Sequence, residues 1–254
     1  MKLKANLHFH SKENSLDIIE YNLFDGIDKA VELGFNVLAV TCYNKFIITD
    51  HHKKYAAEKG ILLIPGIEIN IHEKWTKNYN RVVVLGCDET ATTLHTFEDL
   101  KRYRAEHPEI FIFVPCQYLF ERVDFKKLVE KHIDLFDAIE LSWFYTLWFN
   151  PNTGAAKIAE KFNKPFVATS DARFLRFINT GFTTIETEEK TLKSIFKALR
   201  SFKYENTTTP RTLFEIIFIF GYYKIRSTYK KIKRNIRMHF QEKKKYVTSY
   251  RNEA

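Results

Sequence analysis

Short apolar runs alternate with amphipathic stretches along most of this chain, and that alternation restricts the fold more than any other feature. The runs ILLI, RVVVLG and IFIFV are apolar at almost every position. Strands of this kind are buried on both faces, which is typical of a parallel sheet covered by helices. Gly34 and Gly60 stand where helices would end, just before the next strand. The pattern predicts an α/β protein.

The number of strand segments and the chain length of 254 residues fit one α/β barrel better than an open sheet. The expected strands are Ala5–His10, Asn36–Thr41, Ile61–Ile71, Arg81–Gly86, Ile110–Pro115, Ala138–Ser142, Pro165–Thr169 and Gly181–Ile185. The expected helices are Ser15–Leu33, Asp50–Lys59, Thr96–Glu106, Asp124–Leu135, Thr153–Phe162 and Thr191–Phe202.

The net charge of +9 is concentrated at the C-terminal end of the chain. Residues 222–254 contain 11 Lys+Arg and 2 Asp+Glu, whereas residues 1–221 contain 29 of each. A neutral body argues against a protein that works mainly as a nucleic-acid groove, and it leaves the basic end for anionic partners. We therefore expect a barrel domain over residues 1–210 and a C-terminal tail over residues 211–254.

The remaining composition favours a soluble protein of a reducing compartment. The chain is 45% hydrophobic and 28% charged, which is ordinary for a globular protein. Three cysteines cannot form a disulfide framework. The N-terminus has no apolar stretch of signal-peptide length, and the apolar stretch of residues 213–223 is too short to span a bilayer. We expect a cytoplasmic protein, with peripheral membrane attachment through the tail as a further hypothesis.

Polar residues stand at the ends of several expected strands. In an α/β barrel, the carboxyl ends of the strands form one rim, and catalytic residues are found there. The candidate residues at this rim are His8, His10, Glu68, Cys116, Asp171 and Arg173.

His8 and His10 are two positions apart on a strand, so both imidazoles point to the same face. Together with Glu68 and Asp171 they would form a two-nitrogen, two-oxygen site suited to Zn, Mn or Fe. The alternative is that the histidines are half-buried and hydrogen-bonded to nearby backbone. Carboxylates beside apolar strands need a partner, which favours the metal site.

Several motifs occur in the order and spacing of a known family. They are LHFHS, GFNVLAVTCYN, KGILLIPGIEIN, FVPCQY, FDAIELSW and KPFVATSDARF. Over about residues 5–200 the sequence resembles the PHP (polymerase and histidinol phosphatase) superfamily. The resemblance implies a distorted (β/α)7 TIM-type barrel with up to three metal ions. It also implies hydrolysis of phosphoesters, among them sugar phosphates, nucleotides and nucleic-acid ends.

The family's metal ligands are only partly present. The resemblance assigns His8, His10, Glu68 and Asp171 to one complete metal site. Other ligand positions of the family hold Cys42, Tyr43, Cys116, Arg173 and either Arg81 or Val83. This pattern implies one divalent ion rather than three, with Cys116 as a further soft ligand.

Two functions remain open from the sequence. The first is a metal-dependent phosphoesterase acting on a phosphorylated small molecule or nucleotide. In it Glu68 and Arg173 take part in catalysis, and Arg173, with Lys45 or Lys12, holds the phosphate. The second is a non-catalytic module that binds a phosphorylated ligand or an anionic surface, in which Arg173 merely pairs with a carboxylate.

The C-terminal tail has two parts. Residues 211–221 are apolar nearly all round, which predicts burial against the barrel or a partner. Beyond them, one face of a basic helix is formed by Ile225, Tyr229, Ile232, Ile236 and Phe240. Such a helix suits an anionic membrane surface or nucleic-acid phosphates, and it also suits a solvated helix packed on its own barrel.

Overall fold

The computed structural model describes residues 1–254 except 15–18, 74–78, 116–122, 220, 223, 227 and 229–254. The side chains of residues 79 and 123–125 also lie outside this description. The chain divides into two compact units, Met1–Arg211 and Thr212–Ala254. Each unit is described by itself below.

One sheet forms the framework of the first unit, and its strands are hydrogen-bonded in the order β7-β6-β5-β4-β3-β2-β1-β8-β9. The strands are β1 (Lys2–Phe9), β2 (Val37–Val40), β3 (Leu62–His72), β4 (Tyr79–Leu85), β5 (Phe111–Val114), β6 (Ala138–Ser142), β7 (Phe166–Thr169), β8 (Gly181–Glu186) and β9 (Tyr204–Thr208).

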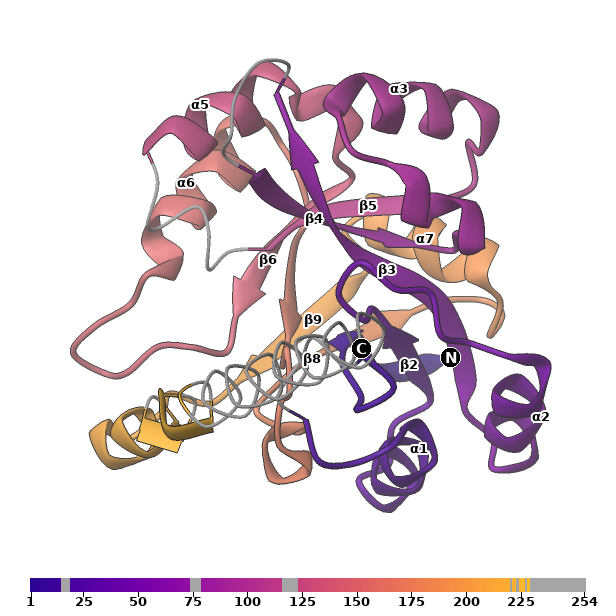
Figure 1. The fold of residues 1–254 in the computed structure, drawn as a ribbon. Coiled ribbons are helices and arrows are strands. Elements are labelled where there is room, and N and C mark those ends of the chain that lie inside the picture. The colour runs from indigo at the N-terminus through magenta and orange to yellow at the C-terminus, as the bar shows by residue number, and fades with distance from the viewer. Residues whose placement is uncertain are drawn as a thin grey trace, which may run out of the picture. The chain divides into compact units, whose positions relative to one another are not determined.

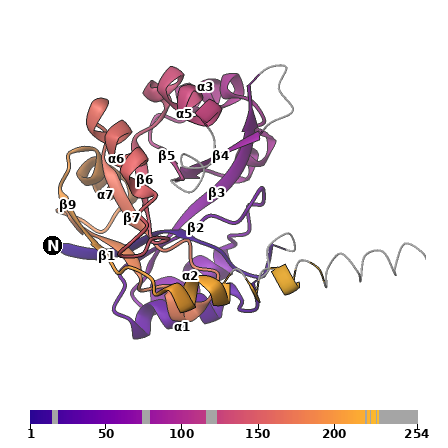
Figure 2. The same ribbon diagram turned by 90° about the vertical axis from the view of Figure 1, so that its left-hand side faces the viewer.

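Helices lie around the outside of the sheet, as Figures 1 and 2 show. The α-helices are α1 (Leu23–Glu32), α2 (Asp50–Glu58), α3 (Phe97–Glu106), α5 (Val123–Lys131), α6 (Asn152–Lys161) and α7 (Leu192–Arg200). Short 3₁₀ helices are η1 (Glu89–Thr93), η2 (Ile133–Leu135) and η3 (Leu175–Phe177).

Side chains bring the two ends of the sheet together into a nearly closed barrel. The backbone N–H groups of Phe166 and Ala168 on β7 donate to Tyr204 Oη and Asn206 Oδ1 on β9, both at 2.8 Å. In return, Asn206 Nδ2 donates to the Phe166 carbonyl at 2.6 Å, and Thr183 Oγ1 of β8 donates to the Ala168 carbonyl at 2.9 Å. These bonds satisfy β7 groups that would otherwise form an open edge. The expected distorted TIM-type barrel is confirmed.

The approach of β8 to β7 at this seam gives a test of the closure. A Cβ placed on Gly181 would overlap the carbonyl oxygen of Thr169. We expect Gly181→Ala to lower the free energy of unfolding by about 1–3 kcal/mol through overpacking, measured by urea denaturation. Gly154→Ala is the matched control because nothing lies near that position within α6. The control should be neutral or stabilising, and equal effects of the two substitutions would contradict the close approach.

The barrel interior is apolar at the end away from the rim. Leu7, Ile64, Phe113 and Val167 from four strands belong to one buried cluster. Phe196 of α7 belongs to the same cluster, so α7 covers this end of the barrel. On β3 and β7, residues two or four positions after Ile64 and Val167 point the same way, towards the rim. The polar site described below forms that next layer.

Four expectations about the elements need correction. The expected helix Ser15–Leu33 begins only at Leu23, because Asn22 and Asp25 form a capping box there; residues 15–18 lie outside the described ones. Strand β4 is antiparallel to both β3 and β5, although its run RVVVLG predicted a parallel strand. Its burial on both faces comes from the barrel interior on one side and α3 on the other.

The other two corrections lie further along the chain. The expected helix Asp124–Leu135 is broken into α5 and η2, which meet at His132. Strand β9 was not expected, because its sequence YENTT is polar and partly exposed and lacks the alternating pattern of a strand.

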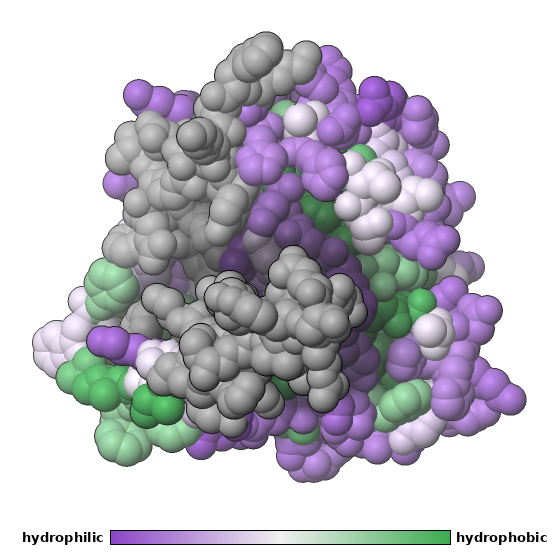
Figure 3. All heavy atoms as spheres, in the orientation of Figure 1, coloured by the Kyte–Doolittle hydropathy of each residue, from purple (hydrophilic) through white to green (hydrophobic). Residues whose placement is uncertain are grey.

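The second unit begins with helical turns over residues 213–219. Leu213, Phe214 and Ile217 are 70%, 77% and 61% exposed, and Ile225 is 71% exposed. Figure 3 shows hydrophobic residues on the surface where Figure 1 draws this helix. The expected burial of this segment against the barrel or a partner stays a prediction. In the part of the chain that the structure describes, no helix is both long and apolar enough for a transmembrane span.

Candidate metal centre

A β-bulge directs the two histidines at the end of β1. Leu7 faces the barrel interior, and strict alternation would send Phe9 there as well. The register with β2 shifts between Asn6 and Phe9, so Phe9 instead packs outward against α1. His8 and His10 consequently face the interior, and both are fully buried. The expectation that the two imidazoles share a face agrees with this geometry.

Glu68 enters the same space from β3. It lies four positions after the interior residue Ile64 and is fully buried. The end of β2 holds this part of β3, because Asn44 N donates to the Glu68 carbonyl at 2.7 Å. Asn44 Oδ1 in turn accepts from Asn70 N at 2.8 Å. Asn44 has a φ of 48°, a left-handed conformation that asparagine adopts more readily than most residues.

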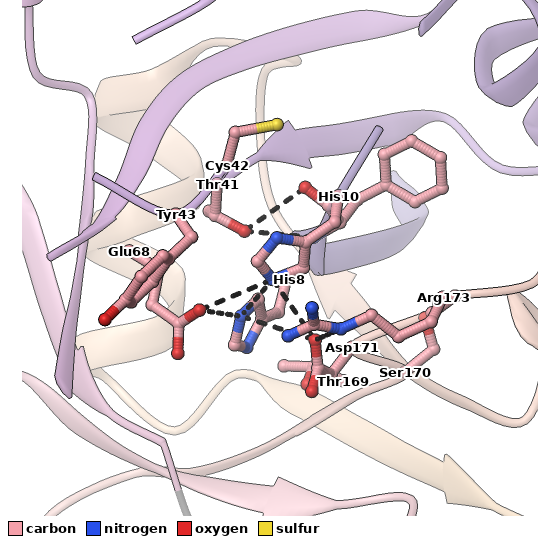
Figure 4. Close-up of polar contacts among 12 residues, drawn as sticks. His8, His10, Thr41, Cys42, Tyr43, Glu68, Thr169, Ser170, Asp171 and Arg173 are labelled. Atoms are coloured by element: carbon pink, nitrogen blue, oxygen red, sulfur yellow. Dashed lines mark hydrogen bonds and ion pairs between the residues drawn. The ribbon is translucent and has the colours of Figure 1, made fainter. Parts of the chain in front are cut away.

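Asp171 follows β7 and has a φ of 38°. Aspartate is one of the few residues other than glycine that tolerate this left-handed region, and such conformations cluster at functional sites. The turn directs its carboxylate towards the histidines of β1, as Figure 4 shows. Arg173 Nε lies 3.3 Å from Asp171 Oδ1, so this arginine pairs with a carboxylate of the site.

Four donor atoms converge between these strands. The Nε2 atoms of His8 and His10 are 3.1 Å apart. His10 Nε2 lies 3.2 Å from Asp171 Oδ1 and 3.6 Å from Glu68 Oε2, and His8 Nε2 lies 3.8 Å and 4.0 Å from the same two oxygens. A tetrahedral ion with bonds of about 2.1 Å needs donor atoms about 3.4 Å apart. His8, His10 and Asp171 therefore fit a divalent ion, and they form the only such group among the described residues. Glu68 lies beside the two imidazoles but is not a member of this group.

Glu140 on β6 completes the surroundings of His8, and the sequence analysis missed it as a site residue. Its Oε1 lies 2.7 Å from His8 Nδ1 and accepts a 2.5 Å hydrogen bond from Thr169 Oγ1. A carboxylate on Nδ1 leaves Nε2 to face the site, which is the usual outer-shell arrangement of a metal-binding histidine. The sequence could have indicated Glu140 as a site residue, because it is the one charged residue in the strand AIELS.

The electrostatics of the site favour a bound cation. Burial disfavours protonation of His8, but the surrounding carboxylates, Glu140 first, outweigh burial and raise the pKa of His8 to about 9. Burial also opposes ionisation of Asp171. Arg173 and the two imidazoles overcome that effect and hold the pKa of Asp171 well below its ordinary value. The ligand set thus carries an excess of negative charge that a proton or a metal ion can neutralise.

Arg81 of β4 lies on the other side of Glu68. Its Nη1 is 3.3 Å and 3.4 Å from the two carboxylate oxygens of Glu68. Its guanidinium carbon lies 4.4 Å from the centre of the Tyr43 ring. The sequence analysis left Arg81 and Val83 as alternatives at this place. Val83 packs in the interior apolar cluster, so Arg81 is the residue that reaches the site.

The other sequence candidates have these positions. Cys116 lies outside the described residues. Cys42 is buried with its Sγ 3.6 Å from Ser11 Oγ. Lys45 Nζ donates to the Glu13 carbonyl at 2.6 Å, and Lys12 is exposed.

The fold and the converging donors define an α/β barrel with a candidate metal centre at its rim. A family model described as PHP-associated matches residues 149–203. No curated protein matches the sequence. This match supports the PHP-superfamily domain that the sequence resemblance predicted.

Solved structures share the barrel at low sequence identity. A two-domain protein from Bacteroides vulgatus, described as containing a predicted PHP-like metal-dependent phosphoesterase, is 17% identical with a TM-score of 0.62. The alignment covers 82% of this chain and 65% of that protein, so this chain spans less than two thirds of its length.

Two further structures are similar to a comparable degree. PsfC from Pseudomonas syringae is 13% identical, with a TM-score of 0.56 and coverage of 88% of this chain and 98% of that one. The lesion-specific endonuclease EndoQ from Pyrococcus furiosus is 14% identical, with a TM-score of 0.55 and coverage of 86% and 66%. At these identities the likeness supports the fold, and the activity has to be argued from the site.

Proposed function

We propose that this protein is a metal-dependent phosphoesterase with a reduced metal centre of one ion. The observation that carries the proposal is the convergence of His8, His10 and Asp171 in a buried, negatively charged site, with Glu68 Oε2 3.6 Å and 4.0 Å from the two histidine Nε2 atoms. Zn, Mn and Fe accept such a mixed nitrogen and oxygen set. Cys116 stays a proposed extra ligand.

Each residue has a role in this proposal. His8, His10, Glu68 and Asp171 hold the ion, and Glu140 fixes the orientation of His8. A divalent ion there would polarise a phosphoryl oxygen and lower the pKa of an attacking water. Arg173, which is 16% exposed beside Asp171, binds the phosphate through its guanidinium. Glu68 takes part in catalysis as a ligand of the ion that also contacts Arg81.

The substrate class is a phosphorylated small molecule or a nucleotide. The structural similarity to an endonuclease is compatible with a nucleotide substrate, although the endonuclease activity belongs to that other protein. The alternative is a non-catalytic module that binds a phosphorylated ligand through the same residues. It is favoured by the pairing of Arg173 with Asp171, which gives this arginine a structural role without any reaction.

Metal analysis of full-length protein purified without chelator tests the proposal. We expect about one equivalent of divalent metal, and hydrolysis of a generic phosphate ester that a chelator abolishes and the metal restores. Near-stoichiometric metal without hydrolysis would support the non-catalytic alternative. Protein that takes up no metal even when Zn, Mn or Fe is supplied would reject the metal centre itself.

We also propose that the tail attaches the protein to an anionic membrane surface. Leu213, Phe214 and Ile217 are exposed on one side of the helical turns over residues 213–219, and Ile225 is exposed further along the chain. Residues 222–254 add 11 basic and 2 acidic residues. Exposed apolar side chains favour a lipid interface over nucleic acid, because contacts to phosphates alone do not need them. Most of the basic stretch lies outside the described residues, so its helical pattern stays a prediction.

Substitutions in the apolar face test this attachment. We expect Phe214→Ser combined with Ile217→Ser to weaken co-sedimentation with phosphatidylserine-containing vesicles by about tenfold or more, since each buried CH₂ contributes about 0.8 kcal/mol. Binding should also fall with added salt. Val31→Ser, at an exposed apolar residue of α1, is the matched control. If the variant binds these vesicles as tightly as the wild type while both bind a DNA duplex, a nucleic-acid role replaces the membrane one.

A further inference from the structure

Each of the two carboxylates that would hold the ion also contacts an arginine. Arg81 Nη1 lies 3.3 Å from Glu68 Oε1, and Arg173 Nε lies 3.3 Å from Asp171 Oδ1. The two carboxylates come from strands on different sides of the histidine pair, as Figure 4 shows for Glu68 and Asp171. The two guanidinium groups therefore stand on opposite flanks of the converging donor atoms.

The arginines are the solvent-facing part of this cluster. The side chains of His8, His10 and Glu68 are fully buried and that of Asp171 is 11% exposed, whereas those of Arg81 and Arg173 are 20% and 16% exposed. The two guanidinium groups are therefore the most exposed side chains of this cluster. Electrostatic steering by partly exposed cations raises the local concentration of anionic ligands.

Arg81 is held in a defined orientation. Both of its contacts with Glu68 use Nη1, and its guanidinium carbon lies 4.4 Å from the centre of the Tyr43 ring. A guanidinium offers five N–H donors in a planar arrangement that matches the oxygens of a phosphate. An arginine fixed by a ring and a carboxylate loses less side-chain entropy when it binds an anion than a mobile one does.

We propose that Arg81 is a second phosphate-binding residue opposite Arg173 and that the site selects phosphate monoesters over diesters. This inference rests on the proposed phosphoesterase function and names its substrate class. A monoester has three terminal oxygens, which match the ion, Arg81 and Arg173 one for one. A diester has two, so one of the three cationic groups makes no contact with a terminal oxygen, and a diester lacks the charge-assisted hydrogen bonds of that contact.

Binding of inorganic phosphate tests Arg81 without any turnover. Isothermal titration of metal-loaded full-length protein should show that Arg81→Gln weakens phosphate binding by about 10–100-fold, whereas Arg81→Lys retains part of the affinity. Metal content should stay unchanged, because Arg81 contributes no ligand atom. Arg102→Gln is the matched control, since Arg102 pairs with Asp99 on the exposed side of α3.

The choice of ester gives the second readout. Wild-type protein should hydrolyse p-nitrophenyl phosphate with a higher kcat/KM than bis-p-nitrophenyl phosphate, and Arg81→Gln should reduce this preference by about tenfold. Unchanged phosphate affinity in Arg81→Gln overturns the inference. So does loss of metal together with phosphate, because Arg81 would then act by supporting Glu68. If phosphate binding depends on Arg81 but the protein hydrolyses neither ester, Arg81 remains a phosphate-binding residue and the phosphoesterase function is rejected.

Discussion

His10→Ala is expected to remove divalent metal from the protein and to abolish hydrolysis of phosphate esters with it. His10 Nε2 lies 3.1–3.6 Å from the donor atoms of His8, Asp171 and Glu68, so it is the most central ligand of the set. We expect the affinity for the metal to fall about a thousandfold, beyond the roughly 10–100-fold that follows removal of an outer-shell partner. Inductively coupled plasma analysis and competition with a chelating dye measure this loss.

Two further variants provide an intermediate effect on metal binding and a control with no effect. Glu140→Gln keeps the size of the side chain and removes the charge that faces His8 Nδ1. We expect it to weaken metal binding by about 10–100-fold, between the wild type and His10→Ala. His51→Ala removes an exposed histidine of α2 and should leave metal content unchanged. Stoichiometric metal in His10→Ala, or equal losses in all three variants, would show that the converging donors are not the metal site.

Most of the residues that lie close together in this candidate site could be predicted from the sequence. His8 and His10 were readable because strand geometry places residues two apart on one face. Glu68 and Asp171 were readable as carboxylates at the ends of apolar strands. The sequence could not show the bulge between Asn6 and Phe9, which determines whether the histidines point inward or outward. A register shift depends on the neighbouring strand and leaves no local signature.

Other features depended on contacts between distant segments. Arg81 was one of two alternatives until the pairing of β3 with β4 placed it beside Glu68. Strand β9 has a polar sequence, and it matters because Asn206 and Tyr204 bind the backbone of β7 across the seam. Side chains that replace a backbone ladder cannot be recognised from strand propensity. The fold class, by contrast, follows from the apolar runs alone, since few architectures bury so many strands on both faces.

The largest effect on stability is expected at Asp137, away from the metal centre. This buried carboxylate, just before β6, binds both terminal nitrogens of Arg104 from α3 at 2.8 Å and Arg200 Nε from α7 at 2.9 Å. It also accepts from Ile112 N of β5 at 2.8 Å. Asp137 therefore joins two helices to two strands. Removing one partner of such a network leaves uncompensated charge, so Asp137→Ala should lower the free energy of unfolding by about 3–5 kcal/mol.

The pH dependence of this effect has a defined sign. Burial alone would raise the pKa of Asp137, but the hydrogen bonds from Arg104 and Arg200 outweigh it and lower the pKa below its ordinary value. A lowered pKa in the folded state adds stability above the unfolded pKa of about 3.9, and that stability is lost as the pH falls towards the folded value. Urea denaturation should therefore show the full difference in free energy of unfolding between wild type and Asp137→Ala near pH 7, and this difference should narrow below about pH 4.

Asp134→Ala, at an exposed carboxylate of η2, is the control and should change the free energy of unfolding by no more than about 0.5 kcal/mol. A gap that stays constant from neutral to acid pH would mean that Asp137 stabilises the fold by its shape rather than by its charge.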